Sequence, residues 1–201
     1  MQHYDLIVIG SGPAGEKGAA QAAYFGKKVA LIEKSPNLGG AGINTGTLPS
    51  KTLRETALYF SGLRQRGLYG IDYSLKDGLT VEEFLHRKQV VVETQWATIA
   101  RNLKRHSVEV FHGVASLKDR HTVCVTTNET EETNLTADYI LIATGSSPVR
   151  PTEIPFDDHI IFDSDSILSM DHIPKNMAVI GAGVVLTSST PIIDVTGPDF
   201  T

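Results

Sequence analysis

The sequence predicts an α/β fold in which helices accompany a parallel sheet that carries a small antiparallel β insertion. Three observations support this prediction. An apolar run at residues 5–9 leads directly into the glycine-rich turn 10–15 and then into a helix of small residues. A second apolar run at 28–33 completes a strand, helix and strand, which is typical of a right-handed parallel βαβ unit. A third apolar run, at 139–143, returns the chain to a buried strand.

Composition excludes several classes of protein. The chain has 201 residues, 41% of them hydrophobic and 20% charged, as in ordinary globular domains. With 18 basic and 23 acidic residues the net charge is -5, so nucleic acid is not expected as a partner. The single cysteine, Cys124, has no partner for an internal disulfide and is expected on one face of a strand. There is no apolar run of membrane-spanning length and no secretion signal, so we expect a cytoplasmic protein without membrane contact.

The remaining elements follow in order along the chain. The first helix should stop at Gly26, and a glycine-rich loop at 38–46 should precede a helix over 49–61. Apolar residues recur at helical spacing from Thr80 to about residue 105, where Thr80 and Glu83 form a capping box. Trp96 lies near that apolar stripe, and we expect it to pack rather than to bind a cofactor.

Short strands are expected in the second half of the chain. Residues 108–111 and 122–127 have strand character, 129–136 read as a polar hairpin tip, and 139–143 form the buried strand. Prolines mark a connector over 151–176, and an apolar strand at 177–180 enters a second glycine turn that begins at Gly181.

The first glycine turn carries a binding function. Gly10 permits a tight turn, Gly12 a close approach of the backbone to a pyrophosphate, and Gly15 the packing of helix on strand. The helix amino terminus then directs its amides and its positive dipole at the anion. Glu33 ends the second strand, where a carboxylate accepts hydrogen bonds from both ribose hydroxyls. The pattern predicts a Rossmann-like site for adenosine diphosphate with a free ribose, as in FAD or NAD, and does not choose between them.

A family resemblance chooses FAD. The segment 38–51 resembles the flavin-facing segment of the pyridine nucleotide-disulfide oxidoreductase family, and 143–146 resembles a later strand end of its FAD domain. The resemblance implies a Rossmann-like FAD-binding domain, with a flavin ring near Gly40, Thr47 and Lys51. The implied cofactor-binding residues are Gly10, Gly12, Pro13, Ala14, Gly15, Glu33, Lys34, Gly40, Thr47, Lys51, Gly113, Val114, Ala115, Ala143, Thr144 and Gly145.

The resemblance also implies an activity. Segments 51–55, 65–70 and 163–168 are most similar to the soluble pyridine nucleotide transhydrogenases of this family, which use FAD to pass hydride from NADPH to NAD. Lys51 is the catalytic candidate, because a cation beside the flavin stabilises negative charge as the ring accepts hydride. NAD(P)H as substrate and a homodimer of the full-length parent are further implications.

The departures from the family limit the chemistry. Disulfide reductases of the family carry two cysteines five positions apart, whereas this chain has Gly42 and Thr47 at those positions. Dithiol chemistry is therefore excluded, because neither residue provides a thiolate. A flavin NAD(P)H dehydrogenase with a quinone or dye as acceptor and a non-catalytic remnant of an FAD domain remain as alternatives. The seven histidines are scattered without ligand spacing, so no metal site is expected.

The expected domain organisation is that of a truncated family member. Residues 1–150 form an incomplete FAD-binding domain, 151–176 a connector, and 177–201 the first strand of an NAD(P)-binding domain followed by a divergent tail. Leu186 and Ser188 stand where the family has a glycine and an acidic residue, and the tail after about Val184 is polar and interrupted by proline. The chain alone is therefore expected to be inactive.

Overall fold

The computed structural model describes residues 2–65, 80–127, 131–174 and 176–181. The chain forms two compact units: Met1–Asn44 with Glu93–Ser147, and Thr45–Val92 with Pro148–Thr201. The divergent tail after Val184 lies outside the described residues, as does the family-like segment 66–70. The domain boundaries expected from the sequence stay predictions.

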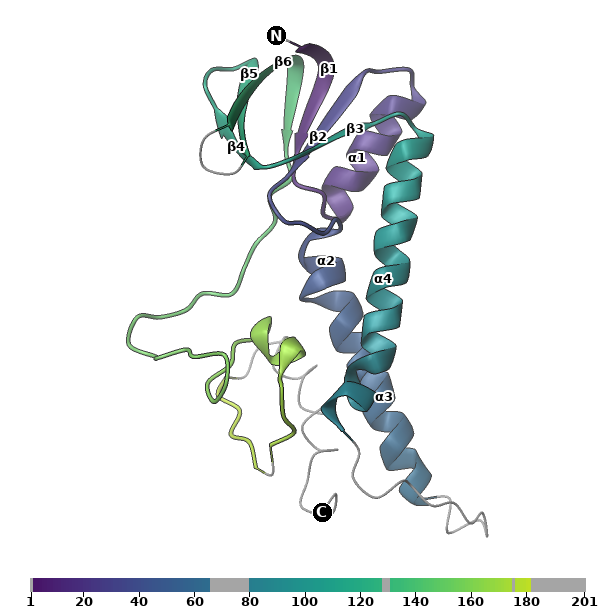
Figure 1. Ribbon diagram of the computed structural model, residues 1–201, viewed down its shortest axis with the longest axis vertical. Helices are drawn as coiled ribbons and strands as arrows, with labels where there is room; N and C mark the ends of the chain where they lie inside the picture. The colour runs from purple at the N-terminus through teal and green to yellow at the C-terminus, as the bar shows by residue number, and fades with distance from the viewer. Residues whose placement is uncertain (1, 66–79, 128–130, 175, 182–201) are drawn as a thin grey trace. The chain divides into compact units, whose positions relative to one another are not determined.

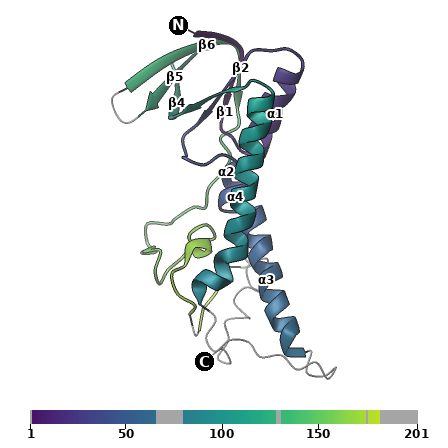
Figure 2. The ribbon, with the colours of Figure 1, turned by 45° about the vertical axis from the view of Figure 1, so that its right-hand side comes forward.

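The first unit is built on a mixed sheet of six strands in the order β3-β2-β1-β6-β5-β4 (Figures 1 and 2). β3, β2, β1 and β6 are parallel neighbours, whereas β5 pairs antiparallel with β6 and β4 pairs antiparallel with β5. The predicted parallel sheet with a small antiparallel insertion is therefore confirmed. The strands are β1 (Gln2–Ile9), β2 (Val29–Glu33), β3 (Glu109–His112), β4 (Val114–Leu117), β5 (Thr122–Thr127) and β6 (Glu131–Ile142).

The βαβ unit at the amino terminus forms as predicted. Helix α1 (Pro13–Tyr24) follows Gly12 and has proline in its first turn, where the missing amide hydrogen costs nothing. Gly26, with φ 76°, follows the last turn in the left-handed conformation that favours glycine. β2 then pairs in parallel with β1, for example Leu6 with Val29.

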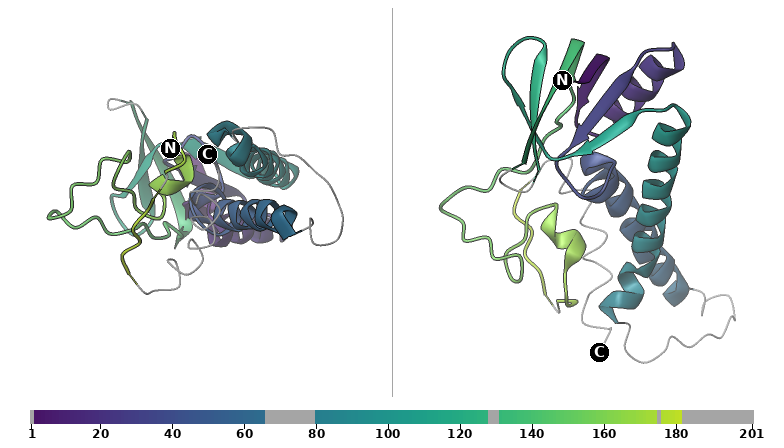
Figure 3. Two further views of the ribbon diagram at one scale, coloured as in Figure 1. Left: turned by 90° about the horizontal axis from the view of Figure 1, so that it is seen from below. Right: turned by 45° about the horizontal axis from the view of Figure 1, so that its top comes forward.

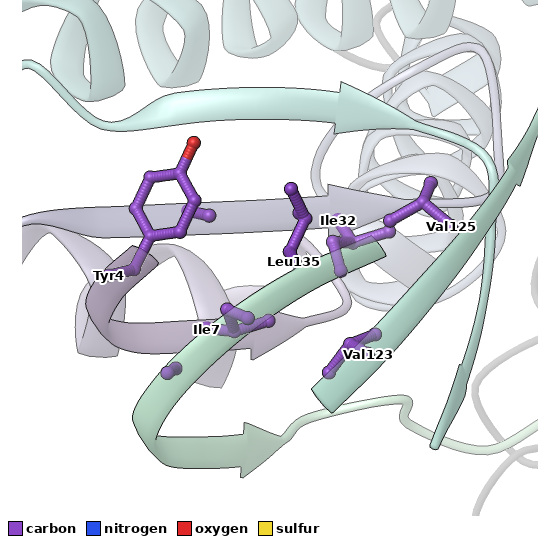
Figure 4. Close-up of a cluster of buried hydrophobic side chains, with 8 residues drawn as sticks. Tyr4, Ile7, Ile32, Val123, Val125 and Leu135 are labelled. Carbon is purple, nitrogen blue, oxygen red and sulfur yellow. The ribbon is translucent and has the colours of Figure 1, made fainter. Parts of the chain in front are cut away.

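The two faces of this sheet bury different cores. On one face, Val8 and Leu31 pack with Ala19 of α1 and with Ile99 and Leu103 of helix α4 (Val81–Arg105). On the other face, β1 and β2 pack against β5 and β6 (Figures 3 and 4). That second cluster consists of Tyr4, Ile7, Ala30, Ile32, Val123, Val125, Leu135 and Ala137. The carboxyl ends of the parallel strands are thus held by a core on each face of the sheet.

The second unit contains α3 (Thr47–Gln65), the first part of α4, and a 3-10 helix η2 (Ser166–Ser169). Its core joins Leu53 and Ala57 of α3 to Phe84 of α4 and Leu168 of η2. The predicted capping box forms at the start of α4: Glu83 N–H donates to Thr80 Oγ1, and Thr80 N–H donates to Glu83 Oε2. No helix in the described part of the chain combines the length and apolar character that crossing a bilayer requires.

Two predictions about secondary structure need correction in the first unit. The expected loop at 38–46 contains a short helix, α2 (Gly40–Asn44), which the Asn44 side chain stabilises by donating to the carbonyl oxygens of Leu38 and Gly40. An additional strand, β4, follows β3 and was not predicted. It has only four residues, most of them exposed, so its sequence shows no clear alternation of apolar and polar residues, and it is a strand because it pairs with β5.

The prediction for the strand that returns to the sheet also needs correction. β6 begins at Glu131, so most of the expected hairpin tip is strand and pairs with β5. The run 139–143 is not fully buried: Tyr139 is 74% exposed and Ile142 62% exposed. Of this run, Ile140 packs against the hydrophobic cluster that contains Tyr4 and Ile7. The residues on either side of Ile140 point to the opposite face of the sheet, because side chains alternate along a strand.

The predicted strand at 177–180 does not form. Residues 177–181 have no regular secondary structure, and Ile180 is 94% exposed. A strand is stabilised by the ladder it shares with a neighbour, and none of the described residues pairs with this segment.

Candidate dinucleotide-binding site

Two glycines of the turn after β1 are required by the packing of the fold itself. Gly10 has φ 102°, and a Cβ there would lie 2.3 Å from the carbonyl oxygen of Ala143. A Cβ on Gly15 would lie 1.9 Å from the carbonyl oxygen of Gly10. These distances are far below van der Waals contact, so both positions exclude any side chain. The turn therefore holds the start of α1 tightly against β1 and the end of β6.

Gly12 differs, because it leaves space in front of the helix. It has φ -60° and ψ 177°, and a Cβ there would meet only Gly40 Cα, at 4.0 Å. No described side chain caps the amino terminus of α1, where Pro13 occupies the first turn. The amides of this turn and the positive helix end therefore suit an anion such as a pyrophosphate. Gly40 has φ 56°, and a Cβ on it would lie 2.8 Å from Gly12 Cα, so the two backbones form one cradle.

Glu33 supplies a carboxylate beside this cradle, at the carboxyl end of β2. Its side chain is buried, and Oε2 accepts hydrogen bonds from Ser11 N–H at 2.9 Å and from the Ser11 hydroxyl at 2.6 Å. Oε1 accepts one from Ser35 N–H at 2.8 Å. Burial alone would raise the pKa of Glu33, but the hydrogen bonds from Ser11 and Ser35 outweigh it and hold the pKa below its ordinary value. The carboxylate is therefore ionised and fixed in position.

The hydrogen bonds of Glu33 limit what it can still bind. A carboxylate offers about four acceptor positions, and three are used by Ser11 and Ser35. The Ser35 side chain also hydrogen-bonds this carboxylate, so a ribose hydroxyl would share or replace one of the serine contacts. The sequence-based expectation of two hydroxyls requires that a bond to Ser11 or Ser35 is exchanged.

Ser11 is a site residue that the sequence analysis missed. Its side chain is fully buried, and its hydroxyl accepts a hydrogen bond from Gly39 N–H at 3.0 Å while it donates to Glu33. Ser11 thereby joins the glycine turn, the carboxylate and the segment that leads to Gly40. A small hydroxyl residue between two glycines was the available signal, but its partners are distant in the sequence.

The remaining site residues of this unit lie at the same end of the sheet. Gly113 donates its N–H to the carbonyl oxygen of Glu33 at 2.9 Å, and a Cβ on it would lie 2.7 Å from the carbonyl oxygen of Thr126. Val114 is exposed on β4, and Ala115 is partly buried. Ala143 and Thr144, just beyond the end of β6, border Gly10, and Gly145 follows them along the chain. Lys34 follows β2 and is exposed. Ligands of α/β proteins bind at such carboxyl ends of parallel strands.

Thr47 and Lys51 are the two candidates outside this unit. Both are exposed on the first turns of α3, in the second unit. The cradle described above consists of first-unit residues alone, and the roles of Thr47 and Lys51 stay predictions.

Two residues decide whether a thiol is available near this cradle. Gly42 lies in α2, where a Cβ would meet Pro13 Cγ at 3.2 Å, a contact tighter than most. The single cysteine, Cys124, is buried on β5 and pairs with Asn134 of β6, as expected for a strand thiol. Residues 38–51 contain no sulfur.

Comparisons with known proteins agree with this geometry. The model of the family "Pyridine nucleotide-disulphide oxidoreductase" matches residues 4–186. A soluble pyridine nucleotide transhydrogenase of Mycobacterium bovis (strain BCG / Pasteur 1173P2) is 45% identical over 186 residues, 92% of this chain and 40% of that protein. The protein of the same name from Pectobacterium atrosepticum is 40% identical over 90% of this chain and 39% of its own length.

A solved structure gives the same result for the fold. The Cu(II) complex of the HOCl-induced flavoprotein disulfide reductase RclA from Escherichia coli has a TM-score of 0.80 and 26% identity, over 98% of this chain and 41% of that one. This chain spans about two fifths of the length of these relatives. The family match covers nearly the whole chain, and this chain belongs to the pyridine nucleotide-disulphide oxidoreductase family.

Proposed function

We propose that this chain forms the FAD-binding part of a flavoprotein that transfers hydride between NADPH and NAD, as a soluble pyridine nucleotide transhydrogenase. Family membership supports the flavin, and the names of the relatives support the reaction. The first-unit cradle supports FAD binding independently, because its uncapped helix terminus and its fixed carboxylate suit a pyrophosphate and a ribose.

Each group of residues has a part in this proposal. The backbone N–H groups of Gly12, Ala14 and Gly15 hold the pyrophosphate at the start of α1, where Pro13 shapes the first turn without donating, and Glu33 accepts a hydrogen bond from the adenosine ribose. Lys34 and the strand start at 113–115 border the adenosine, while 143–145 close the turn from the β6 side. When bound, FAD accepts a hydride from one nicotinamide and gives it to another. Lys51 stabilises the negative charge that this transfer places on its acceptor.

The observation that carries the choice of reaction is the lack of sulfur in the flavin-facing segment. Residues 38–51 resemble the family's segment but hold Gly42 and Thr47 where disulfide reductases have their two cysteines. A reduced flavin beside this segment therefore has no disulfide to which it could pass its electrons. A second nicotinamide is an acceptor that needs no thiol. A cytoplasmic location and a homodimeric parent accompany this proposal as predictions.

A chimera tests the proposed reaction. Residues 1–184 of this chain are joined to the matching remainder of the Mycobacterium bovis relative, loaded with FAD, and mixed with NADPH in a stopped-flow instrument. We expect NADPH to bleach the visible flavin band and NAD to restore it. The same chimera with Gly42→Cys and Thr47→Cys is the matched control, and those cysteines should not speed the recovery by NAD.

Two other results would overturn the proposal in different ways. Recovery of the flavin band by a quinone or dye but not by NAD would favour an NAD(P)H dehydrogenase. Failure of the unjoined chain and of the chimera to retain FAD through gel filtration would favour a non-catalytic remnant.

A further inference from the structure

Three side chains of the second unit come together that the site described above does not use. His159 and His172 both approach the carboxylate of Asp171: His159 Nδ1 lies 3.2 Å from Oδ2, and His172 Nδ1 lies 2.6 Å from Oδ1. The imidazole rings are tilted by 57° to each other, with centroids 5.1 Å apart. One ligand atom from each of the three residues lies within 4.8 Å of the other two. The sequence spacing had suggested that no histidine contributes to such a group.

The turn that contains His159 is held by hydrogen bonds to the Asp157 side chain. Asp157 Oδ1 accepts bonds from the N–H groups of His159, Ile160 and Ile161, at 3.0, 2.8 and 2.8 Å. These three bonds fix the backbone of the turn. Asp158 is left-handed, with φ 58°, and its carboxylate forms a bidentate pair with Arg150. His159 therefore projects from a turn with few alternative conformations.

The segment that carries Asp171 and His172 is anchored by the core of the second unit. η2 ends one residue before Met170, which is buried, and Leu168 of η2 packs on Phe84. Lys88 Nζ donates to the carbonyl oxygen of Leu168 at 2.8 Å. Asp171 thus directly follows the buried Met170, so the two segments that bring its carboxylate and His159 together are both held in place.

The spacing of these atoms suits a divalent cation. Bonds of about 2.0 to 2.1 Å in tetrahedral geometry place neighbouring ligand atoms about 3.3 Å apart. The separation of His159 Nδ1 from Asp171 Oδ2, 3.2 Å, is close to this value. His172 Nδ1 lies closer to the other oxygen, Oδ1, at 2.6 Å, so a cation would take the place of that hydrogen bond and separate the two atoms. Two imidazoles with one carboxylate form a donor set that zinc and its neighbours in the first transition row prefer to calcium or magnesium.

The local charge favours a cation as well. Residues 157–172 contain five aspartates and no lysine or arginine. Arg150, from outside this segment, is committed to Asp158 and Asp163, the latter at 2.6 Å from Nε. All three ligand residues are exposed, so a cation reaches them directly and water completes its coordination.

We propose that His159, Asp171 and His172 bind one divalent cation of the zinc class. The site belongs to the second unit alone and is separate from the dinucleotide cradle of the first. Cation binding at this site therefore needs neither FAD nor a nicotinamide nucleotide.

Calorimetric titration of the chain with zinc chloride, after removal of any polyhistidine tag, tests the proposal. We expect one zinc ion per chain. His159→Ala, His172→Ala and Asp171→Asn should each weaken binding about tenfold or more, since each removes one of three protein ligands. His86→Ala removes another exposed histidine of the same unit and should leave the affinity unchanged. Excess magnesium should not compete.

Imidazole proton resonances provide a second, independent readout. Those of His159 and His172 should shift as the first equivalent of zinc is added, whereas that of His86 should not. Equal affinities for the chain and its three ligand variants would overturn the proposal, as would the absence of binding. All three substituted residues are exposed, and unchanged far-ultraviolet circular dichroism of each variant will show that a lost affinity is not lost folding.

Discussion

Ser11→Ala tests whether one buried hydroxyl organises the dinucleotide site before any ligand arrives. The substitution removes the 2.6 Å hydrogen bond to Glu33 Oε2 and the acceptor of Gly39 N–H. A hydrogen bond to a charged group contributes about 1.5 to 3 kcal/mol, and an unpaired buried amide costs about 1 to 3 kcal/mol. Because Ser11 N–H still holds Oε2, we expect a loss below the sum, about 2 to 4 kcal/mol in the free energy of unfolding.

The pH dependence of this loss identifies its cause. The pKa of Glu33 lies below its ordinary 4.5 in the folded chain, so its ionised form stabilises the fold above that pH. This contribution disappears as the pH falls through the folded pKa. The difference between the parent chain and Ser11→Ala should therefore be largest near neutral pH and shrink progressively below about pH 4.5.

Urea unfolding followed by tryptophan fluorescence is the appropriate assay. The chain has a single tryptophan, Trp96, whose Nε1 donates to Asn44 Oδ1 at 2.8 Å within the first unit. Its emission therefore reports on the unit that contains Ser11. Ser116→Ala, at an exposed position of β4 in the same unit, is the matched control. A destabilisation by Ser11→Ala no larger than that of the control, or one independent of pH, would refute the reasoning.

Five further substitutions separate fold from function. Gly15→Ala should destabilise the first unit by about 1 to 3 kcal/mol or more in urea unfolding, because its Cβ would lie 1.9 Å from a carbonyl oxygen, whereas Gly12→Ala should unfold like the parent yet lose FAD affinity in calorimetry. Glu33→Gln should weaken FAD binding by about 1.5 to 3 kcal/mol, and unchanged affinity would remove it from the site. Lys51→Ala in the FAD-loaded chimera should slow flavin reduction more than it weakens FAD binding, and equal losses would make it structural. Thr80→Ala removes a helix cap and should cost about 1 kcal/mol by circular dichroism.

The βαβ unit could be predicted from the sequence because its signals are local. Apolar runs at 5–9 and 28–33, the glycines at 10, 12 and 15, and the cap of α4 each lie within a few residues of the structure they specify. Gly10 and Gly15 show how strong such signals are, since the contacts of a hypothetical Cβ forbid any other residue. The acidic residue at the end of β2 also lies where the pattern places it.

Elements whose stability depends on distant partners were missed or misjudged. α2 contains Gly40 and Gly42, poor helix formers, and depends on the Asn44 side chain for its hydrogen bonds. The polar start of β6 is a strand because β5 lies beside it, as in the pair of Thr127 with Glu131. The segment 177–180 has the apolar composition of a strand but pairs with no described residue. In each case hydrogen-bond partners, rather than composition, decided the outcome.

The same distinction separates the two sites of this chain. Ser11 and Glu33 lie 22 positions apart, yet Ser11 follows directly on β1 and Glu33 ends β2. The parallel pairing of these two strands brings their ends together, so the carboxylate at least could be predicted. His159 and Asp171 are joined by a connector without helical or strand periodicity, whose path depends on Asp157, Arg150 and η2. The short ligand spacings typical of zinc sites do not describe two ligands that lie twelve positions apart and meet only through the path of this connector. A histidine that looks isolated in an irregular segment is therefore weak evidence against a metal site, and its hydrogen-bonded neighbours must be known before that conclusion is drawn.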